Sequence, residues 1–126
     1  MGIGTTNQSG GLDLGDVTAL QWAGIALAAV TGAIHLVLGV SFLGTPMGWS
    51  FLLAGVGFFA GGGAVAVGYR RRLVYLLGLP FTGVQIVAWY LVNAPAFSVL
   101  GIADKLAQVG LIAVIVGLYR RESAAR

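Results

Sequence analysis

The chain has 126 residues, of which 58% are hydrophobic and only 9% are charged, and its formal net charge is +3. Ordinary soluble domains carry about 25% charged residues, and so short a chain has too little interior to hide this much apolar surface. The composition therefore predicts an integral membrane protein. The lack of cysteine excludes a disulfide framework and a thiolate metal site. Nucleic-acid binding is not indicated, because the basic residues stand at the ends of apolar runs.

Residues 1–16 are rich in glycine, threonine, asparagine, glutamine and serine, which predicts a flexible polar N-terminal tail. This stretch has no lysine or arginine, so we do not expect a cleaved signal peptide. The first apolar run covers residues 17–43, more than the about 20 residues that cross a bilayer. Asp16 precedes the run and is a candidate N-cap for the first helix.

Three breaks separate further apolar spans at residues 49–69, 73–93 and 99–119, and the last span starts at residue 99 or at residue 103. They are the turn-forming residues 44–48, the three arginines at 70–72, and a proline-containing stretch at 93–95. An arginine at the bilayer centre costs about 2.5–3.5 kcal/mol, so the chain must reach the surface at 70–72 through a tight antiparallel hairpin. The prediction is an all-α transmembrane domain over residues 17–121. It forms a four-helix bundle of two helical hairpins, followed by a short tail at 122–126.

The basic residues orient this bundle. Four spans place six of the seven basic residues on one membrane face and leave only Lys105 on the other. The basic residues that anchor the topology are Arg70, Arg71, Arg72, Arg120 and Arg121. Because lysine and arginine collect on the cytoplasmic side, both termini are predicted to be cytoplasmic, in a multi-pass protein of the cell membrane. Every tryptophan and tyrosine is expected at or near a membrane interface, as in an aromatic belt.

Glycine makes up 21 residues and predicts close helix packing. Small residues allow helix backbones to approach in lipid, where the hydrophobic effect does not drive helices together. In the first span, Gly24, Gly32 and Gly39 fall on one face with His35. The second span contains Gly57 and a further glycine four residues later. These faces predict packing within one bundle, with dimerisation through a small-residue face as the alternative.

Polar residues inside the spans are the candidate functional residues. Counted from the predicted outer helix ends, His35, Gln85 and Gln108 all lie about 8–12 Å below the outer surface, so they could form one polar layer. Thr82 and Trp89 share a helical stripe with Gln85 and complete this candidate layer. The adjacent pair Asp104 and Lys105 is expected at the outer surface, where it would cap and anchor the fourth helix.

This layer has three interpretations. The first is interhelical hydrogen bonding, at about 0.6 kcal/mol per bond. The second is a small polar pocket, open to the outer leaflet, with His35 as a proton carrier or ligand-binding group. The third is a haem ligand, which would require a histidine from a second subunit. No nucleophile–base pair, carboxylate pair, phosphate-binding loop or metal motif is recognisable, so neither enzymatic activity nor a cofactor is predicted.

Two strings in the chain resemble a known group of proteins. Residues 31–40, TGAIHLVLGV, and residues 75–81, YLLGLPF, are similar to small four-span membrane proteins of unknown function from halophilic archaea. The resemblance covers about residues 20–121 and implies a four-span topology without an assigned activity. The basic net charge departs from the acidic character of halophile proteins.

The predicted function is a structural or accessory helix bundle, as a homo-oligomer or a subunit of a larger membrane complex. The first alternative is a small transporter or ligand-binding bundle that uses the layer around His35. Small multidrug transporters have a similar length, but they rely on an intramembrane glutamate, and no acid is expected inside a span here. The second alternative is a redox or quinone-associated protein with a headgroup site near His35 and Trp89. Beyond the bilayer and such protein partners, none is expected.

Overall fold

The computed structural model describes residues 16–124, and this part of the chain forms four helices without a strand. They are α1 (Ala19–Ser41), α2 (Pro46–Val67), α3 (Arg71–Asn93) and α4 (Val99–Ala124). Each helix is long and apolar enough to cross a membrane. The all-helical fold with four such helices is therefore confirmed, whereas the predicted tail at residues 1–15 lies outside the described residues.

The helix starts differ from the predicted ones because the capping side chains differ. Asp16 does not cap α1; Thr18 does, in a reciprocal capping box with Gln21 at distances of 3.1 and 2.9 Å. The Asp16 carboxylate instead lies 3.5 Å from the Arg71 guanidinium. α2 starts three residues before the predicted position, because Thr45 caps it and Pro46 occupies its first turn.

The helix ends also contain one correction. α2 ends at Val67, and its C-cap is Gly68, whose φ of 77° is in the left-handed region that glycine adopts without a Cβ clash. α3 ends at Asn93, as the following proline stretch predicts. α4 does not stop at Tyr119 but continues to Ala124, so residues 122–124, predicted as tail, are helical. The arginines, glutamate and alanine in this segment are good helix formers, which explains the extension.

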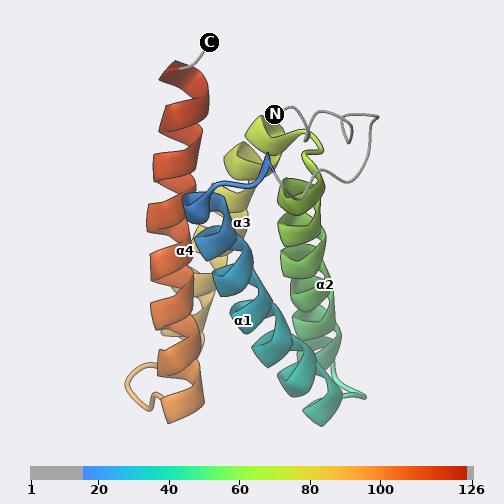
Figure 1. The fold of residues 1–126 in the computed structure, drawn as a ribbon. Coiled ribbons are helices and arrows are strands. Elements are labelled where there is room, and N and C mark those ends of the chain that lie inside the picture. The colour runs from blue at the N-terminus through green and yellow to red at the C-terminus, as the bar shows by residue number, and fades with distance from the viewer. Residues whose placement is uncertain (1–15, 125–126) are drawn as a thin grey trace.

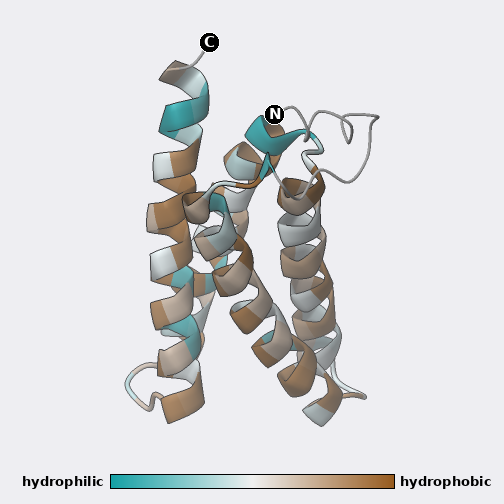
Figure 2. Cartoon of the chain, in the orientation of Figure 1, coloured by the Kyte–Doolittle hydropathy of each residue, from teal (hydrophilic) through white to brown (hydrophobic). Residues whose placement is uncertain are grey.

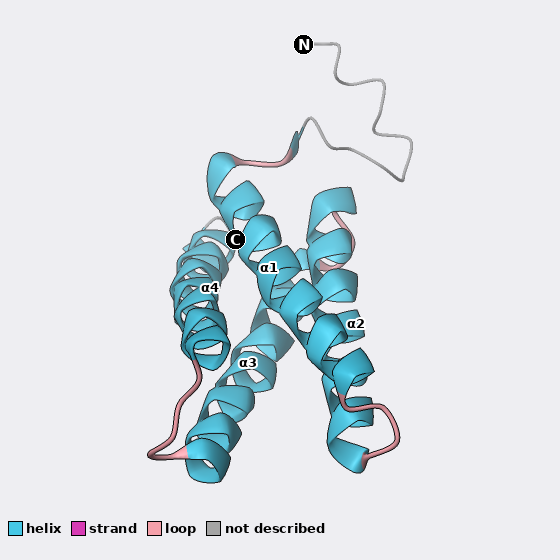
Figure 3. Ribbon diagram, turned by 90° about the horizontal axis from the view of Figure 1, so that it is seen from below, coloured by secondary structure: helices cyan, strands magenta, loops and turns pink. Residues whose placement is uncertain are grey.

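The start of α1, the arginine turn and the end of α4 lie at one end of the molecule, and the other two connections lie at the opposite end (Figure 1). α1 crosses between α2 and α4 and packs against both, while α3 packs mainly against α4 (Figure 3). The contact between α2 and α3 is slight. The connection between them is tight, as predicted, but the two helices diverge from it and do not form a packed hairpin.

The small-residue face of α1 packs inside the bundle, as predicted. A Cβ on Gly32 would lie 2.9 Å from the Phe59 ring, and one on Gly39 would lie 2.7 Å from Leu52 and 3.0 Å from the Gly48 carbonyl oxygen. α1 and α2 therefore approach each other so closely that only glycine fits at these positions. The predicted Gly57 motif of α2 does not take part in this contact, since Gly57 faces Phe81 of α3.

The outer faces of the helices are apolar, and the hydrophilic residues gather mainly at the arginine turn and at the end of α4 (Figure 2). Large side chains such as Leu53, Leu91 and Val99 are strongly exposed, as expected for a surface that contacts lipid. Tyr75, which is expected near a membrane interface, is buried among the helices near the start of α3 and accepts a hydrogen bond of 3.0 Å from Gln21. A tyrosine can occupy an apolar core when its hydroxyl finds a partner.

Candidate functional site

Polar side chains of α1, α3 and α4 form one buried, hydrogen-bonded group, which we call the polar cluster. Its members are Thr31, His35, Gln85, Asp104, Lys105 and Gln108. On α1, Thr31 and His35 are one turn apart, and the His35 Nδ1 lies 2.8 Å from the Thr31 carbonyl oxygen. A carbonyl oxygen only accepts, so this contact assigns the ring proton to Nδ1. The imidazole packs against the rings of Phe51 and Phe58, with centroid distances of 5.7 and 5.6 Å.

Asp104 and Lys105 belong to this cluster, which corrects their predicted place at the outer surface. Both side chains are buried. The Asp104 carboxylate accepts from the Thr31 hydroxyl and, at 2.7 Å, from the Lys105 ammonium, and it lies 3.8 Å from His35 Nδ1. α4 already begins at Val99, so Asp104 lies about 8 Å along the helix rather than at its first residue.

Gln108 connects the three helices of the cluster. It is fully buried, and its amide nitrogen donates to the Thr31 hydroxyl on α1 at 3.2 Å and to the Gln85 side-chain oxygen on α3 at 3.1 Å. Its amide oxygen accepts from Lys105 at 2.8 Å. The structure thus brings His35, Gln85 and Gln108 into one group. The two glutamines do not bond His35, whose Nδ1 contacts Thr31 instead and lies 3.8 Å from the Asp104 carboxylate.

The other two predicted members of the layer differ from each other. Trp89 borders the cluster, because the Lys105 ammonium lies 5.8 Å from its ring centroid, within cation–π range. The same ring stacks on Phe97 at 4.5 Å, so the turn after α3 supports it. Thr82 is not part of the cluster. It is buried, and its hydroxyl has no hydrogen-bond partner among the described residues.

The cluster balances its charges internally. One carboxylate faces one ammonium, and the ammonium directs its donors at Asp104, at Gln108 and at the Trp89 ring. Buried ion pairs persist only when their remaining donors and acceptors are also satisfied. The Thr31 hydroxyl lies between Asp104 and the His35 ring, 3.4 Å from Nδ1. The arrangement therefore places a carboxylate and an imidazole on either side of one hydroxyl group.

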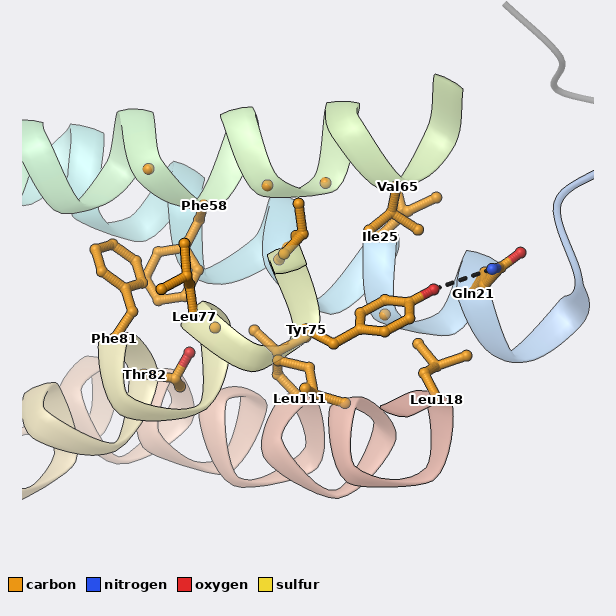
Figure 4. A pocket seen from close by; sticks show the side chains of 18 residues that line it. Gln21, Ile25, Phe58, Val65, Tyr75, Leu77, Phe81, Thr82, Leu111 and Leu118 are labelled. Atoms are coloured by element: carbon orange, nitrogen blue, oxygen red, sulfur yellow. Dashed lines mark hydrogen bonds between the residues drawn. The ribbon is translucent and has the colours of Figure 1, made fainter. Parts of the chain in front are cut away.

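A second feature is an apolar cavity of about 490 Å³ between all four helices. Figure 4 shows its lining, with Tyr75 and Gln21 hydrogen-bonded at one end and Thr82 toward the other. The remaining lining side chains are aliphatic or aromatic, apart from glycines, and include Phe58 and Leu111. On α1, α3 and α4, the cavity residues lie nearer the end of the bundle that holds the arginine turn than the cluster residues do, so the cavity and the cluster occupy different halves of the bundle.

The arginine turn is organised by one of its three arginines. Arg71 donates from Nε to the Val65 carbonyl oxygen at 2.8 Å and thereby satisfies the end of α2. Arg72 donates to the Tyr119 hydroxyl at 3.4 Å and lies over its ring. The other topology anchors, Arg70, Arg120 and Arg121, are exposed. Within residues 16–124, no group of three histidine, cysteine, aspartate or glutamate side chains could hold a metal ion.

The fold and site define a class of four-helix proteins with membrane-crossing helix lengths and a buried acid–base cluster. The chain belongs to the DUF7475 family of unknown function, whose sequence profile matches residues 13–119. The match includes all of α1, α2 and α3 and most of α4. The search of curated proteins and the search of solved structures found no match.

Proposed function

We propose that the chain is a multi-pass protein of the cell membrane and that it acts as a small proton-coupled carrier or ligand-binding bundle rather than as an enzyme. One observation carries the proposal: Asp104, Lys105 and His35 are buried together inside helices of membrane-spanning length. Ionisable residues inside a membrane are costly, and they mark ion pathways, proton relays or binding sites. The sequence alone predicts no acid inside a span, which argues against a transporter. Asp104 is such an acid, because it is buried within α4.

Proton exchange would act on the contact between α1 and α4. The Asp104 carboxylate accepts from Thr31 of α1 and from Lys105. A proton on this carboxyl would remove its charge and convert one oxygen into a donor. Lys105 would then keep Gln108 and the Trp89 ring as partners, and the nearest described titratable group on another helix would be His35. Protonation of Asp104 would therefore rearrange the hydrogen bonds that join these helices.

The second candidate is a structural or accessory bundle, as a homo-oligomer or a subunit of a larger complex. The observation that favours it is the saturation of the cluster, in which Asp104, Lys105 and Gln108 all have partners. In this candidate the cluster joins helices and does not change its protonation. Both candidates share the bilayer as environment, cytoplasmic termini and no nucleic-acid partner. The resemblance to four-span proteins of halophilic archaea fits either.

Infrared difference spectroscopy of the protein in lipid, between acidic and alkaline buffer, separates the two candidates. We expect a protonated-carboxyl band that shifts when aspartate is ¹³C-labelled and disappears in Asp104→Asn. His35→Gln should move its titration, whereas Asp16→Asn, which changes an exposed acid outside the cluster, should not. The chain has only four acidic residues, so the assignment is tractable. If no pH-dependent band is lost in Asp104→Asn, the cluster only joins the helices without changing its protonation, and the carrier proposal is wrong.

A further inference from the structure

The apolar cavity opens sideways between α2 and α3. These two helices make only slight contact, and the cavity is lined on α3 by Leu77 and Phe81, whose residues are 58% and 38% exposed. In a bilayer this opening would face the lipid. The cavity volume falls in the range of about 300–1,000 Å³ that is typical of small-molecule sites. A molecule dissolved in the membrane could therefore enter from the side.

Two of the glycines that line the cavity, Gly61 and Gly62, differ from the glycines that pack α1 on α2. A Cβ on Gly61 would meet only Val74, at 3.7 Å, and a Cβ on Gly62 would meet Ala28 at 3.7 Å. These are ordinary contacts, so helix packing does not require glycine at either position. By contrast, Gly39 would place its Cβ 2.7 Å from Leu52. The effect of Gly61 and Gly62 is to leave space where a side chain would fit.

Thr82 provides the one unpaired polar atom on the cavity wall. Its residue is only 1% exposed, and its hydroxyl has no partner within the described part of the chain. Figure 4 shows the Thr82 oxygen pointing from α3 toward the side where Phe58 of α2 lies. A helical threonine commonly bonds the carbonyl four residues earlier, which this hydroxyl does not do. Buried polar groups are normally paired, so a hydroxyl in this position indicates a partner that enters the cavity.

We infer that the cavity binds a lipid-soluble small molecule with an apolar body and one oxygen, which accepts a hydrogen bond from the Thr82 hydroxyl. At the far end of the cavity, the Tyr75 hydroxyl oxygen already accepts a hydrogen bond from the Gln21 amide. Tyr75 and Thr82 are seven residues apart on α3, which gives the ligand a length of about 10 Å. This inference goes beyond the proposed function and does not depend on proton exchange, because Thr82 is outside the polar cluster.

Photolabelling with benzophenone tests the inference on the full chain in lipid nanodiscs. This probe is an apolar diaryl ketone with a single carbonyl oxygen, and ultraviolet light attaches it to nearby C–H groups. Peptide mass spectrometry should find the label on the parts of α2 and α3 that line the cavity. Thr82→Val, which removes the hydroxyl at nearly constant volume, should lower the labelling about 2- to 10-fold, as expected for one lost hydrogen bond. Thr82→Ser should restore it.

A matched glycine pair controls for folding and for partition into lipid. Gly61→Leu should fill the cavity and abolish the specific label, whereas Gly63→Leu should not, because a Cβ on Gly63 meets nothing within 4 Å. If Gly61→Leu blocks labelling but Thr82→Val labels like wild type, the cavity takes an acyl chain without oxygen recognition, and the inference is overturned. Labelling that spreads over all lipid-facing helices and ignores Gly61→Leu would exclude a site altogether. Unchanged thermal unfolding of Thr82→Val shows that the variant is folded.

Discussion

Gln108 is the residue on which the polar cluster depends most, because it bonds three other side chains. Its amide group contacts Thr31, Gln85 and Lys105, which belong to three different helices. A side-chain amide has two donor hydrogens and one acceptor oxygen, and this geometry uses all three. The position therefore requires both the length and the polarity of glutamine.

The ion pair beside Gln108 gives a prediction on coupling. Asp104→Asn should destabilise the protein by about 3–5 kcal/mol, because it leaves the buried Lys105 ammonium without a counter-charge. Lys105→Gln should have a similar cost for the opposite reason. The double variant should lose much less than the sum of the two single losses, in unfolding followed by circular dichroism in mixed micelles. Additive losses would show that the two charges do not interact.

Gly48 gives a second prediction, because it has the least space of any described glycine. A Cβ there would lie 2.2 Å from the backbone oxygen of Phe42, which cannot move as a flexible side chain can. Gly48→Ala should lower the free energy of unfolding by about 1–3 kcal/mol. Gly63→Ala is the matched control and should be stabilising by up to about 1 kcal/mol, since alanine favours helix and the site is open. Equal melting of the two variants would contradict the close α1–α2 packing.

The sequence predicts part of this site. The polar layer of His35, Gln85 and Gln108 follows from helix depth alone, because residues at equal depth on neighbouring helices meet. Asp104 and Lys105 are missed because the sequence allows the fourth helix to start at residue 99 or 103, and a charge near a helix end is normally solvated. One signal was present: Asp104 and Gln108 are four residues apart, so they share a helix face. Thr82 cannot be assigned from sequence, since only the packing shows whether a hydroxyl is paired.

At the scale of the elements, the start of α1 gives a prediction that compares two neighbouring residues, the capping Thr18 and the acidic Asp16. Thr18→Ala removes the capping box with Gln21 and should destabilise the protein by about 1 kcal/mol. Asp16→Ala removes only an exposed ion pair with Arg71 and should cost less than about 1 kcal/mol. Thermal unfolding of both variants measures the difference. A larger loss of stability in Asp16→Ala than in Thr18→Ala would show that Asp16, and not Thr18, caps α1.

The relative placement of the elements is less accessible to sequence than the elements themselves. Four apolar runs and their breaks predict four helices, since length and hydrophobicity are local properties. The divergence of α2 and α3 depends on side-chain contacts across the bundle, which no local pattern contains. Close glycine contacts draw α2 onto α1, while α3 follows α4. The cavity opens between α2 and α3 because α2 packs on α1 and α3 packs on α4.

At the scale of the whole molecule, the arginine turn predicts the orientation in the membrane. The chain has no native cysteine, so single cysteines can be placed at Ser9, Thr45, Ala96 and Ala124. An impermeant thiol reagent on intact cells should label the Thr45 and Ala96 variants, because both connections opposite the arginine turn would face outward. The Ser9 and Ala124 variants should react only after the cells are opened. The reverse pattern would place the arginines outside.

The contact between α1 and α4 can form only late in the synthesis of the chain. Thr31 meets Asp104 and Gln108, which follow it by 73 and 77 residues in the chain. At about 5–20 residues per second, a ribosome needs roughly 4–15 s to supply these partners. Through that interval the newly made α1 carries the Thr31 hydroxyl without its side-chain partners on α4. The hydrogen bonds of α1 are therefore complete only after α4, the last of the four described helices, has been made.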